Sequence, residues 1–192
     1  MIKLYGYRQP LALVVLFLQF ILSGCGNTSS ASISSFSPTS GTAGTTVTIV
    51  GTNFDTTTAN NAVRFNGTSA VVTSSTSTEI VSTVPSGATT GPISVTVNSQ
   101  TATSSSNFTV IPAITSFSPT SGSAGTTVTI TGTGFDTTTT NNIVKFNGTT
   151  AVVASSTSTS IVTAVPSGAA TGQITVTVNG QSAISSTNFT VN

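Results

Sequence analysis

The sequence predicts an all-β protein made of two tandem antiparallel β-sandwiches, and three observations support this fold class. The segment that begins at Ile33 recurs at Ile114, with an offset of 81 residues and identity at 59 of 79 paired positions. Within each copy, apolar residues alternate with Ser and Thr in short runs, which is the period of a half-buried strand. Val, Ile and Thr favour strands and are abundant. After residue 25 no stretch has a helical period. Seven or so short strands in about 80 residues indicate a sandwich.

The repeat also predicts the domain organisation. A period of 81 residues exceeds that of a solenoid unit, so each copy is expected to be a duplicated domain that closes its own core. Domain 1 is expected at residues 33–111 and domain 2 at residues 114–192, with residues 112–113 as the linker. Because a short linker that contains Pro112 cannot behave as a loose coil, the two domains are expected to form a short stiff rod.

The first strands of domain 1 follow from alternation and from one turn. Residues 46–50 place Val47 and Ile49 on a single face. Asn66-Gly67 favours a type I′ hairpin between the next two strands. The predicted cross-strand pairs are Phe65 with Thr68 and Val63 with Ala70. The side chains expected to share one face are Val63, Phe65, Ala70 and Val72.

Three further strands complete the domain. Residues 79–85 form one strand, which Pro85 ends, and Gly87 and Gly91 mark the turn that follows. Residues 91–98 form another, with Ile93, Val95 and Val97 directed toward one side. Residues 105–110 form the last strand.

The N-terminus predicts export and anchoring. Residues 1–24 combine a basic start, a short apolar core and small residues near its end, which are the parts of a secretory signal. The end of this segment, "LSGC", resembles the lipobox of bacterial lipoproteins, and the resemblance implies that Cys25 becomes the lipidated first residue. The other interpretations are a plain secretory signal, an uncleaved anchor or an inert thiol. Residues 25–32 are then the lipidated cysteine and a flexible tether.

Gly26 bears on the location of the anchor. Asp at this position resembles the inner-membrane retention signal of Gram-negative lipoproteins, and this chain has Gly there. The resemblance therefore favours the outer membrane or the cell surface.

Charge is scarce, and this excludes several functions. After Cys25 the chain carries Arg64 and Lys145 against Asp55, Asp136 and Glu79, a net charge of 2 − 3 = −1. Nucleic acid is not an expected partner, because phosphate binding requires clustered Lys and Arg.

Catalysis is not expected either, and we predict no catalytic residue, no cofactor and no metal site. The chain has no His, and a Ser nucleophile needs a base. Paired-carboxylate chemistry would have only Asp55 and Glu79 in domain 1, and Ser160 replaces Glu79 in domain 2. Asp55 and Asp136 are compatible with a weak calcium site, but one carboxylate per site favours a turn capped by its own side chain.

Two surface residues and eight aromatic residues remain to be assigned. Arg64 and Lys145 occupy matching positions on the outward face of a strand, where each can contact a ligand or discourage edge-to-edge pairing. The aromatic residues are expected in the two cores: Phe36, Phe54, Phe65 and Phe108, with Phe117, Phe135, Phe146 and Phe189. After Cys25 there is no Trp or Tyr, which counts against stacking on sugar rings.

The landmarks "SFSPTSGTAGTTVTIVGTNF", "VRFNGTSA", "IVSTVPSGATTGPISVTV" and "NFTV" occur in order and recur in both copies. They resemble the IPT/TIG family of immunoglobulin-like domains, which implies two tandem immunoglobulin-like sandwiches. The family includes surface receptors, adhesins, accessory domains of polysaccharide-acting enzymes and a DNA-binding branch, so the fold does not determine the function. We expect a membrane-anchored structural or adhesive module with a protein partner. The alternative is a glycan-binding accessory lipoprotein.

Overall fold

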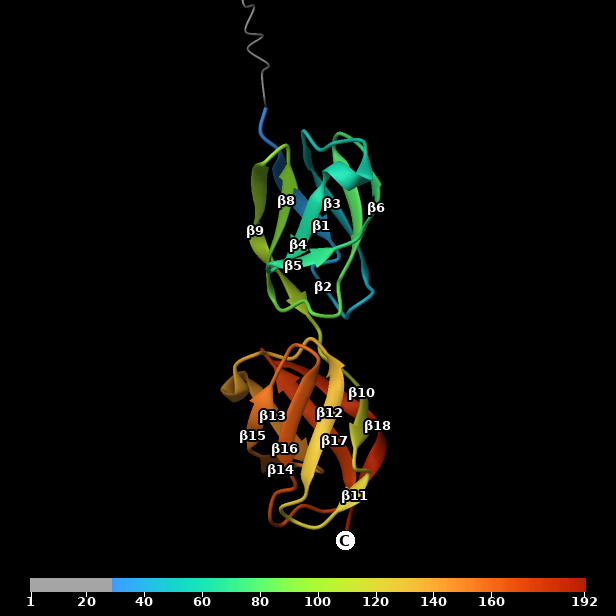
Figure 1. The fold of residues 1–192 in the computed structure, drawn as a ribbon, viewed down its shortest axis with the longest axis vertical. Helices are drawn as coiled ribbons and strands as arrows, with labels where there is room; N and C mark the ends of the chain where they lie inside the picture. Colours follow the sequence, from blue (N-terminus) through green and yellow to red (C-terminus); the bar gives the residue numbers. More distant parts are fainter. Residues whose placement is uncertain (1–28) are drawn as a thin grey trace, which may run out of the picture.

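The computed structural model describes residues 29–192 and contains two β-sandwiches in line along the long axis of the molecule (Figure 1). The chain enters the upper sandwich at its outer end, and the C-terminus lies at the opposite end of the lower one. The predicted all-β class with two tandem sandwiches is confirmed. The described residues also contain two three-residue 3₁₀ turns that the sequence pattern does not predict, η1 (Thr58–Asn60) and η2 (Thr139–Asn141).

Domain 1 consists of a four-stranded and a five-stranded sheet packed face to face. All strand pairs are antiparallel except β2 with β9, which is parallel. The first sheet has the order β1 (Ser32–Ser37), β3 (Thr46–Thr52), β7 (Glu79–Thr83) and β6 (Val72–Ser75). The second has the order β2 (Ser40–Gly41), β9 (Gln100–Val110), β8 (Gly91–Val97), β4 (Ala62–Phe65) and β5 (Thr68–Ala70).

Domain 2 repeats this topology strand for strand. Its four-stranded sheet has the order β10 (Ala113–Ser118), β12 (Thr127–Thr133), β16 (Ser160–Ala164) and β15 (Val153–Ser156). Its five-stranded sheet has the order β11 (Ser121–Gly122), β18 (Gln181–Val191), β17 (Gly172–Val178), β13 (Asn142–Phe146) and β14 (Thr149–Ala151). Each copy therefore forms a complete sandwich, as expected of a duplicated domain.

The hairpin predicted at Asn66-Gly67 is confirmed. Asn66 and Gly67 have φ values of 44° and 86°, and positive φ at both central residues defines a type I′ turn. The register pairs Phe65 with Thr68 and Val63 with Ala70, as the sequence predicts.

One assignment near this hairpin needs correction. The alternation predicts Val72 on the same two-stranded unit as Val63, but it belongs to β6 in the opposite sheet. Val72 still packs against the core of domain 1. The chain crosses between the sheets at Val71, so Ala70 and Val72 reach the core from opposite sides and Val71 is 69% exposed.

The last strand of the domain is also longer than expected. β9 begins at Gln100 rather than Ser105, because Asn98 and Ser99 form a tight turn with φ values of 49° and 64°. The strand bulges at Ser104, whose buried hydroxyl accepts the Ile93 N–H at 2.9 Å and donates to the Ser106 carbonyl at 2.7 Å. This bulge lets one long strand bend while its backbone groups stay bonded.

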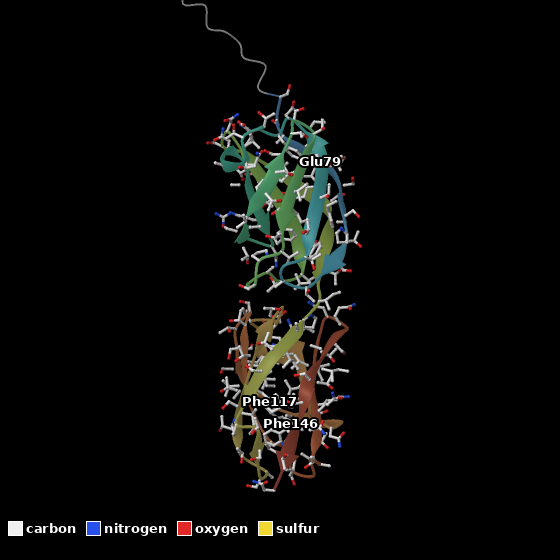
Figure 2. The ribbon with its side chains drawn as sticks, turned by 90° about the vertical axis from the view of Figure 1, so that its right-hand side faces the viewer. Glu79, Phe117 and Phe146 are labelled. Carbon is white, nitrogen blue, oxygen red and sulfur yellow. The ribbon has the colours of Figure 1, made fainter. Side chains whose placement is uncertain are left out.

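Each domain has its own core, and the eight predicted phenylalanines are buried there. Phe65 meets Phe108 edge to face at 5.2 Å, and Phe146 meets Phe189 in the same way at 5.1 Å. Figure 2 shows Phe117 and Phe146 within domain 2. Val47 and Ile49 are fully buried, and Ile93, Val95 and Val97 are buried along β8, as predicted.

The strand ends differ slightly from the expected boundaries. β1 begins at Ser32, within the predicted tether, because Ser32 pairs with Thr52 and their hydroxyl oxygens lie 2.8 Å apart. β10 begins at Ala113, within the predicted linker. Only Ile111 and Pro112 therefore lie between the last strand of domain 1 and the first strand of domain 2.

Candidate functional site

The two predicted contact residues lie on the outer faces of the five-stranded sheets. Arg64 on β4 is exposed, and its Nη1 donates to the Gly67 carbonyl at 2.9 Å. Lys145 occupies the matching position on β13 and is also exposed. The structure therefore gives Arg64 a local role in supporting its own hairpin. It places the two cations on different domains and does not bring them together (Figure 1).

The surroundings of Lys145 are more apolar than those of Arg64. Across the strands, Lys145 pairs with Thr150 and Thr175, and Thr175 in turn pairs with Ile184. Ile143 and Ile184 are 48% and 60% exposed, and domain 1 has Ala62 and Thr103 at these positions. The outer face of domain 2 thus combines exposed aliphatic and hydroxyl groups around a single cation.

Asp55 and Asp136 each organise the loop that contains η1 or η2. One carboxylate oxygen of Asp55 accepts the Thr57 N–H at 2.7 Å, and the other accepts the Asn60 amide at 3.0 Å. Asp136 accepts the corresponding bonds at 2.7 and 3.1 Å. The interpretation of these residues as turn-capping is confirmed, because N–H donors face both carboxylate oxygens in each loop.

The Asp55 loop is supported from below by a buried amide. The Asn61 side chain accepts the Asp55 N–H at 3.0 Å and donates to the Asp55 carbonyl at 2.7 Å. The Thr57 N–H, followed by the Asn60 amide, holds the pKa of Asp55 below its ordinary value of 3.8. In residues 29–192, no three His, Cys, Asp or Glu side chains gather in an arrangement that could hold a metal ion.

The ends of the two sandwiches form a further site, which the sequence analysis does not predict. We call residues 42–45 and 85–90 the lower end of domain 1, and residues 123–126 and 166–171 the lower end of domain 2. The upper ends are residues 52–57 with 76–79 in domain 1, and residues 133–138 with 157–160 in domain 2. The lower end of domain 1 faces the upper end of domain 2 (Figure 1).

Burial differences between identical residues identify the lower half of this junction. At three matched positions the residue in domain 1 is more buried than its counterpart in domain 2. The pairs are Ala43 and Ala124, Gly87 and Gly168, and Ala88 and Ala169. Gly87 and Gly168 also differ in backbone conformation, because only Gly168 has a positive φ, of 79°. The two alanine pairs have the same side chain at matching positions of the same turns, so their extra burial in domain 1 comes from contact with domain 2.

The upper ends show the opposite difference. Three identical pairs are exposed in domain 1 and half-buried in domain 2: Thr52 and Thr133, Ser77 and Ser158, and Thr78 and Thr159. A Cβ placed on Gly87 would lie 3.5 Å from the Ser158 Oγ, so the two loops are in contact. The junction is therefore an interface formed by both ends.

The linker is held on both sides. The Ile111 N–H donates to the Gly41 carbonyl of domain 1 at 2.9 Å, and Pro112 is buried. On the other side, Gly134 is so close that a Cβ there would lie 2.9 Å from Val110 Cγ1 and 3.1 Å from Pro112 Cα. Close packing on both sides supports the stiff connection that the sequence predicts.

Two differences between the copies fall on the upper ends. Domain 1 has Asn53 and Glu79 where domain 2 has Gly134 and Ser160. Asn53 and Glu79 are exposed, and Figure 2 shows Glu79 at the end of domain 1 that points away from domain 2. Small uncharged residues thus occur where the upper end is covered, and larger polar ones where it is open. A comparison of the two copies at these two positions is therefore the sequence signal that could have located the junction.

Cys25, the predicted lipidation residue, lies outside the described residues. Among residues 29–192, no helix has the length and apolar character needed to cross a membrane.

Two sandwiches of identical topology, stacked through a covered junction, define a tandem immunoglobulin-like module. The chain matches the IPT/TIG domain family over residues 31–110 and again over residues 112–191. It therefore belongs to the IPT/TIG family.

Several solved structures are similar to this chain. A protein from Bacteroides thetaiotaomicron described as a candidate phosphatase has 34% identity and a TM-score of 0.43, with 44% of this chain and 19% of that chain covered. The surface glycan-binding protein PbSGBP-B from Prevotella bryantii has 23% identity and a TM-score of 0.48, with 79% and 38% covered. An auxiliary nutrient binding protein from Bacteroides ovatus has 23% identity and a TM-score of 0.40, with 46% and 22% covered.

Among these three solved chains, the matched part spans between 19% and 38% of their length. A search of curated proteins finds no match.

Proposed function

We propose that this chain is a non-enzymatic lipoprotein, anchored in the cell envelope through Cys25, that serves at the outer membrane or cell surface as a structural and adhesive module. The observation that carries the proposal is the covered junction, which holds the two domains in line. The anchor would lie at the upper end of domain 1, because the described chain enters there. Domain 2 would then be the part farthest from the membrane.

A stiff arm suits this role for an energetic reason. A flexible connection between two domains loses conformational freedom when both are engaged, whereas a preorganised one loses less. The Gly134 contacts and the Ile111 hydrogen bond provide that preorganisation. Two domains that share 59 of 79 residues can also present two similar weak sites, whose combined affinity gains from effective concentration.

The test combines the mature N-terminus with surface exposure. Mass spectrometry of the purified protein should find an acylated Cys25 as the first residue. On intact cells, an externally added antibody against domain 2 should bind the wild type and lose its membrane-associated signal in the Cys25→Ser variant. An unmodified N-terminus, or a Cys25→Ser protein that stays in the membrane, would contradict the proposed anchor. Domain 2 that is inaccessible on intact cells would contradict the surface role.

Glycan binding is the second candidate, and the outer face of domain 2 favours it. Sugar sites combine apolar contacts with a few fixed polar groups, and Ile143 and Ile184 flank Thr175 and Lys145 on this face. The assay is a glycan array with the soluble fragment from Gly26 onward. The paired variants are Ile184→Thr, which installs the domain 1 residue, and Lys145→Ala. Saturable binding to one polysaccharide that both variants abolish would replace the adhesive role with the glycan role. Binding to protein partners alone would support the adhesive role.

A further inference from the structure

The lower end of domain 2 is a second copy of the surface with which domain 1 holds its neighbour. Ala124 and Gly168 are exposed there, and Ala169 is half-buried, whereas the matching Ala88 of domain 1 is fully buried. A Cβ on Gly87 would lie 3.5 Å from the Ser158 Oγ across the junction, so this part of the surface is covered in domain 1. The same small-residue surface thus occurs covered in one domain and open in the other.

We propose that this open lower end of domain 2 is a docking surface for the upper end of another IPT/TIG-like sandwich, one with small uncharged residues at the positions of Gly134 and Ser160. The occupant follows from the junction itself, where such an upper end covers the matching surface of domain 1. The main difference at the lower end, Thr89 in domain 1 and Ala170 in domain 2, makes the open copy smaller and more apolar.

The upper end of domain 1 is the wrong partner for this surface. Asn53 places a side chain where Gly134 has none, and a Cβ at Gly134 would already lie 2.9 Å from Val110 Cγ1 in the junction. Glu79 would bring a carboxylate into the position of Ser160, and covering an unpaired charge is costly.

Two copies of this chain are therefore kept from stacking head to tail. This matters because a heterologous contact between identical chains produces open filaments. Asn53 and Glu79 act as the repulsive element that makes the lower end selective for a different domain. The inference goes beyond the proposed function by naming a partner class, and it does not depend on the anchor at Cys25.

The experiment gives the upper end of domain 1 the residues that domain 2 has at its own upper end, so that it can dock on the lower end of domain 2. The soluble fragment from Gly26 onward lacks Cys25, so engineered cysteines can act as the only thiols. Ser77→Cys and Gly168→Cys occupy the positions that match Ser158 and Gly87, where a Cβ on Gly87 would lie 3.5 Å from the Ser158 Oγ. Gly168 has a φ of 79°, so the same cysteine pair is kept in every fragment compared and only the change in linkage rate is interpreted. Added Asn53→Gly and Glu79→Ser replace the two excluding residues with those of domain 2.

The expected result is faster end-to-end linkage. Under mild oxidation, disulfide-linked chains of this variant should form at least about tenfold faster than in the fragment with the cysteine pair alone. Adding Ala169→Glu, which puts a charge on the lower end, should return the rate to that of the cysteine pair alone. An intramolecular control, Gly87→Cys with Ser158→Cys, should close rapidly at any protein concentration.

Three results would overturn the inference. Equal linkage rates with and without Asn53→Gly and Glu79→Ser would show that these residues do not exclude the partner. Linkage that survives Ala169→Glu would place the contact elsewhere. An intramolecular pair that stays reduced would remove the junction from which the docking surface is inferred. Asn53→Gly alone removes an exposed side chain and its hydrogen bonds to the Ser30 carbonyl and the Thr52 hydroxyl, and it leaves the core intact. That single variant is the fallback if Glu79→Ser disturbs folding, and it should give an intermediate rate.

Discussion

Gly134→Asn should loosen the connection between the domains without destabilising domain 2. Gly134 has a φ of 72°, in the left-handed region that disfavours most side chains. Asn is the exception in this protein, because Asn53 adopts a φ of 58° at the matching position of domain 1. The backbone of domain 2 can therefore accept Asn, and the cost arises at the junction.

The magnitude follows from the space available. The new Cβ would lie 2.9 Å from Val110 Cγ1, 3.1 Å from Pro112 Cα and 3.2 Å from the Ile111 carbonyl oxygen. Two of these three atoms belong to the backbone of the linker, so the linker must move. Overpacking of a filled site costs about 1–3 kcal/mol, and a shift of about 2 kcal/mol changes an equilibrium about thirtyfold. The free energy of the stacked arrangement should rise by about that amount relative to arrangements in which the two domains are not in contact.

The assay is ¹⁵N relaxation of the fragment from Gly26 onward. In the wild type, both domains should tumble together as one elongated body. In Gly134→Asn, each domain should show a shorter rotational correlation time, with an unchanged melting temperature. The matched control is Asn53→Gly, which makes the reverse exchange at the open upper end and should leave the relaxation unchanged. A variant that tumbles like the wild type, or one whose domain 2 melts at a lower temperature, would refute the steric argument.

Three other predictions test the fold. Strands β9 and β18 have 11 residues each and are therefore about 36 Å long. Two domains of this length stacked end to end should give a radius of gyration of about 21 Å in X-ray scattering, whereas a single globule of the same 192 − 28 = 164 residues would give about 15 Å. Phe65→Ala should destabilise domain 1 by about 3–5 kcal/mol in urea unfolding, because Phe65 is 1% exposed and packs on Phe108; a tolerated change would contradict the core. The pKa of Asp55 is lowered on folding, so its stabilising effect is present above the unfolded value and is lost as the pH falls below about 4; Asp55→Asn should remove that part of the pH dependence of melting, and an unchanged profile would contradict the assigned hydrogen bonds.

Local signals are sufficient to predict much of the fold. Asn66-Gly67 determines both the turn type and the register, because few dipeptides tolerate two positive φ values in succession. The alternation along residues 91–98 identifies the buried face of β8 for a similar reason. Both features depend on neighbouring residues only.

The errors arise where the local pattern is misleading or weak. Val72 follows Ala70 by two residues, so the period of two places them on one strand, but the crossover at Val71 puts them in different sheets. The early part of β9 is polar, and its turn in domain 1 is Asn98-Ser99, which carries a weaker signal than Asn-Gly. The matching turn in domain 2 is Asn179-Gly180, which is a stronger indication of the longer strand.

The junction illustrates why two nearly identical copies carry more information than one. Core positions such as Phe65 and Phe146 are the same in both domains because each domain must close a similar core. Exposed positions are free to differ for many reasons, so a difference there says little by itself. At the upper ends, however, Asn53 with Gly134 and Glu79 with Ser160 differ together with burial, and in each case the covered domain has the smaller residue. Steric and charge exclusion both require the smaller, uncharged residue in the covered domain, and both positions have it there. These two pairs, rather than the lone cations Arg64 and Lys145, therefore indicate where this molecule makes contact.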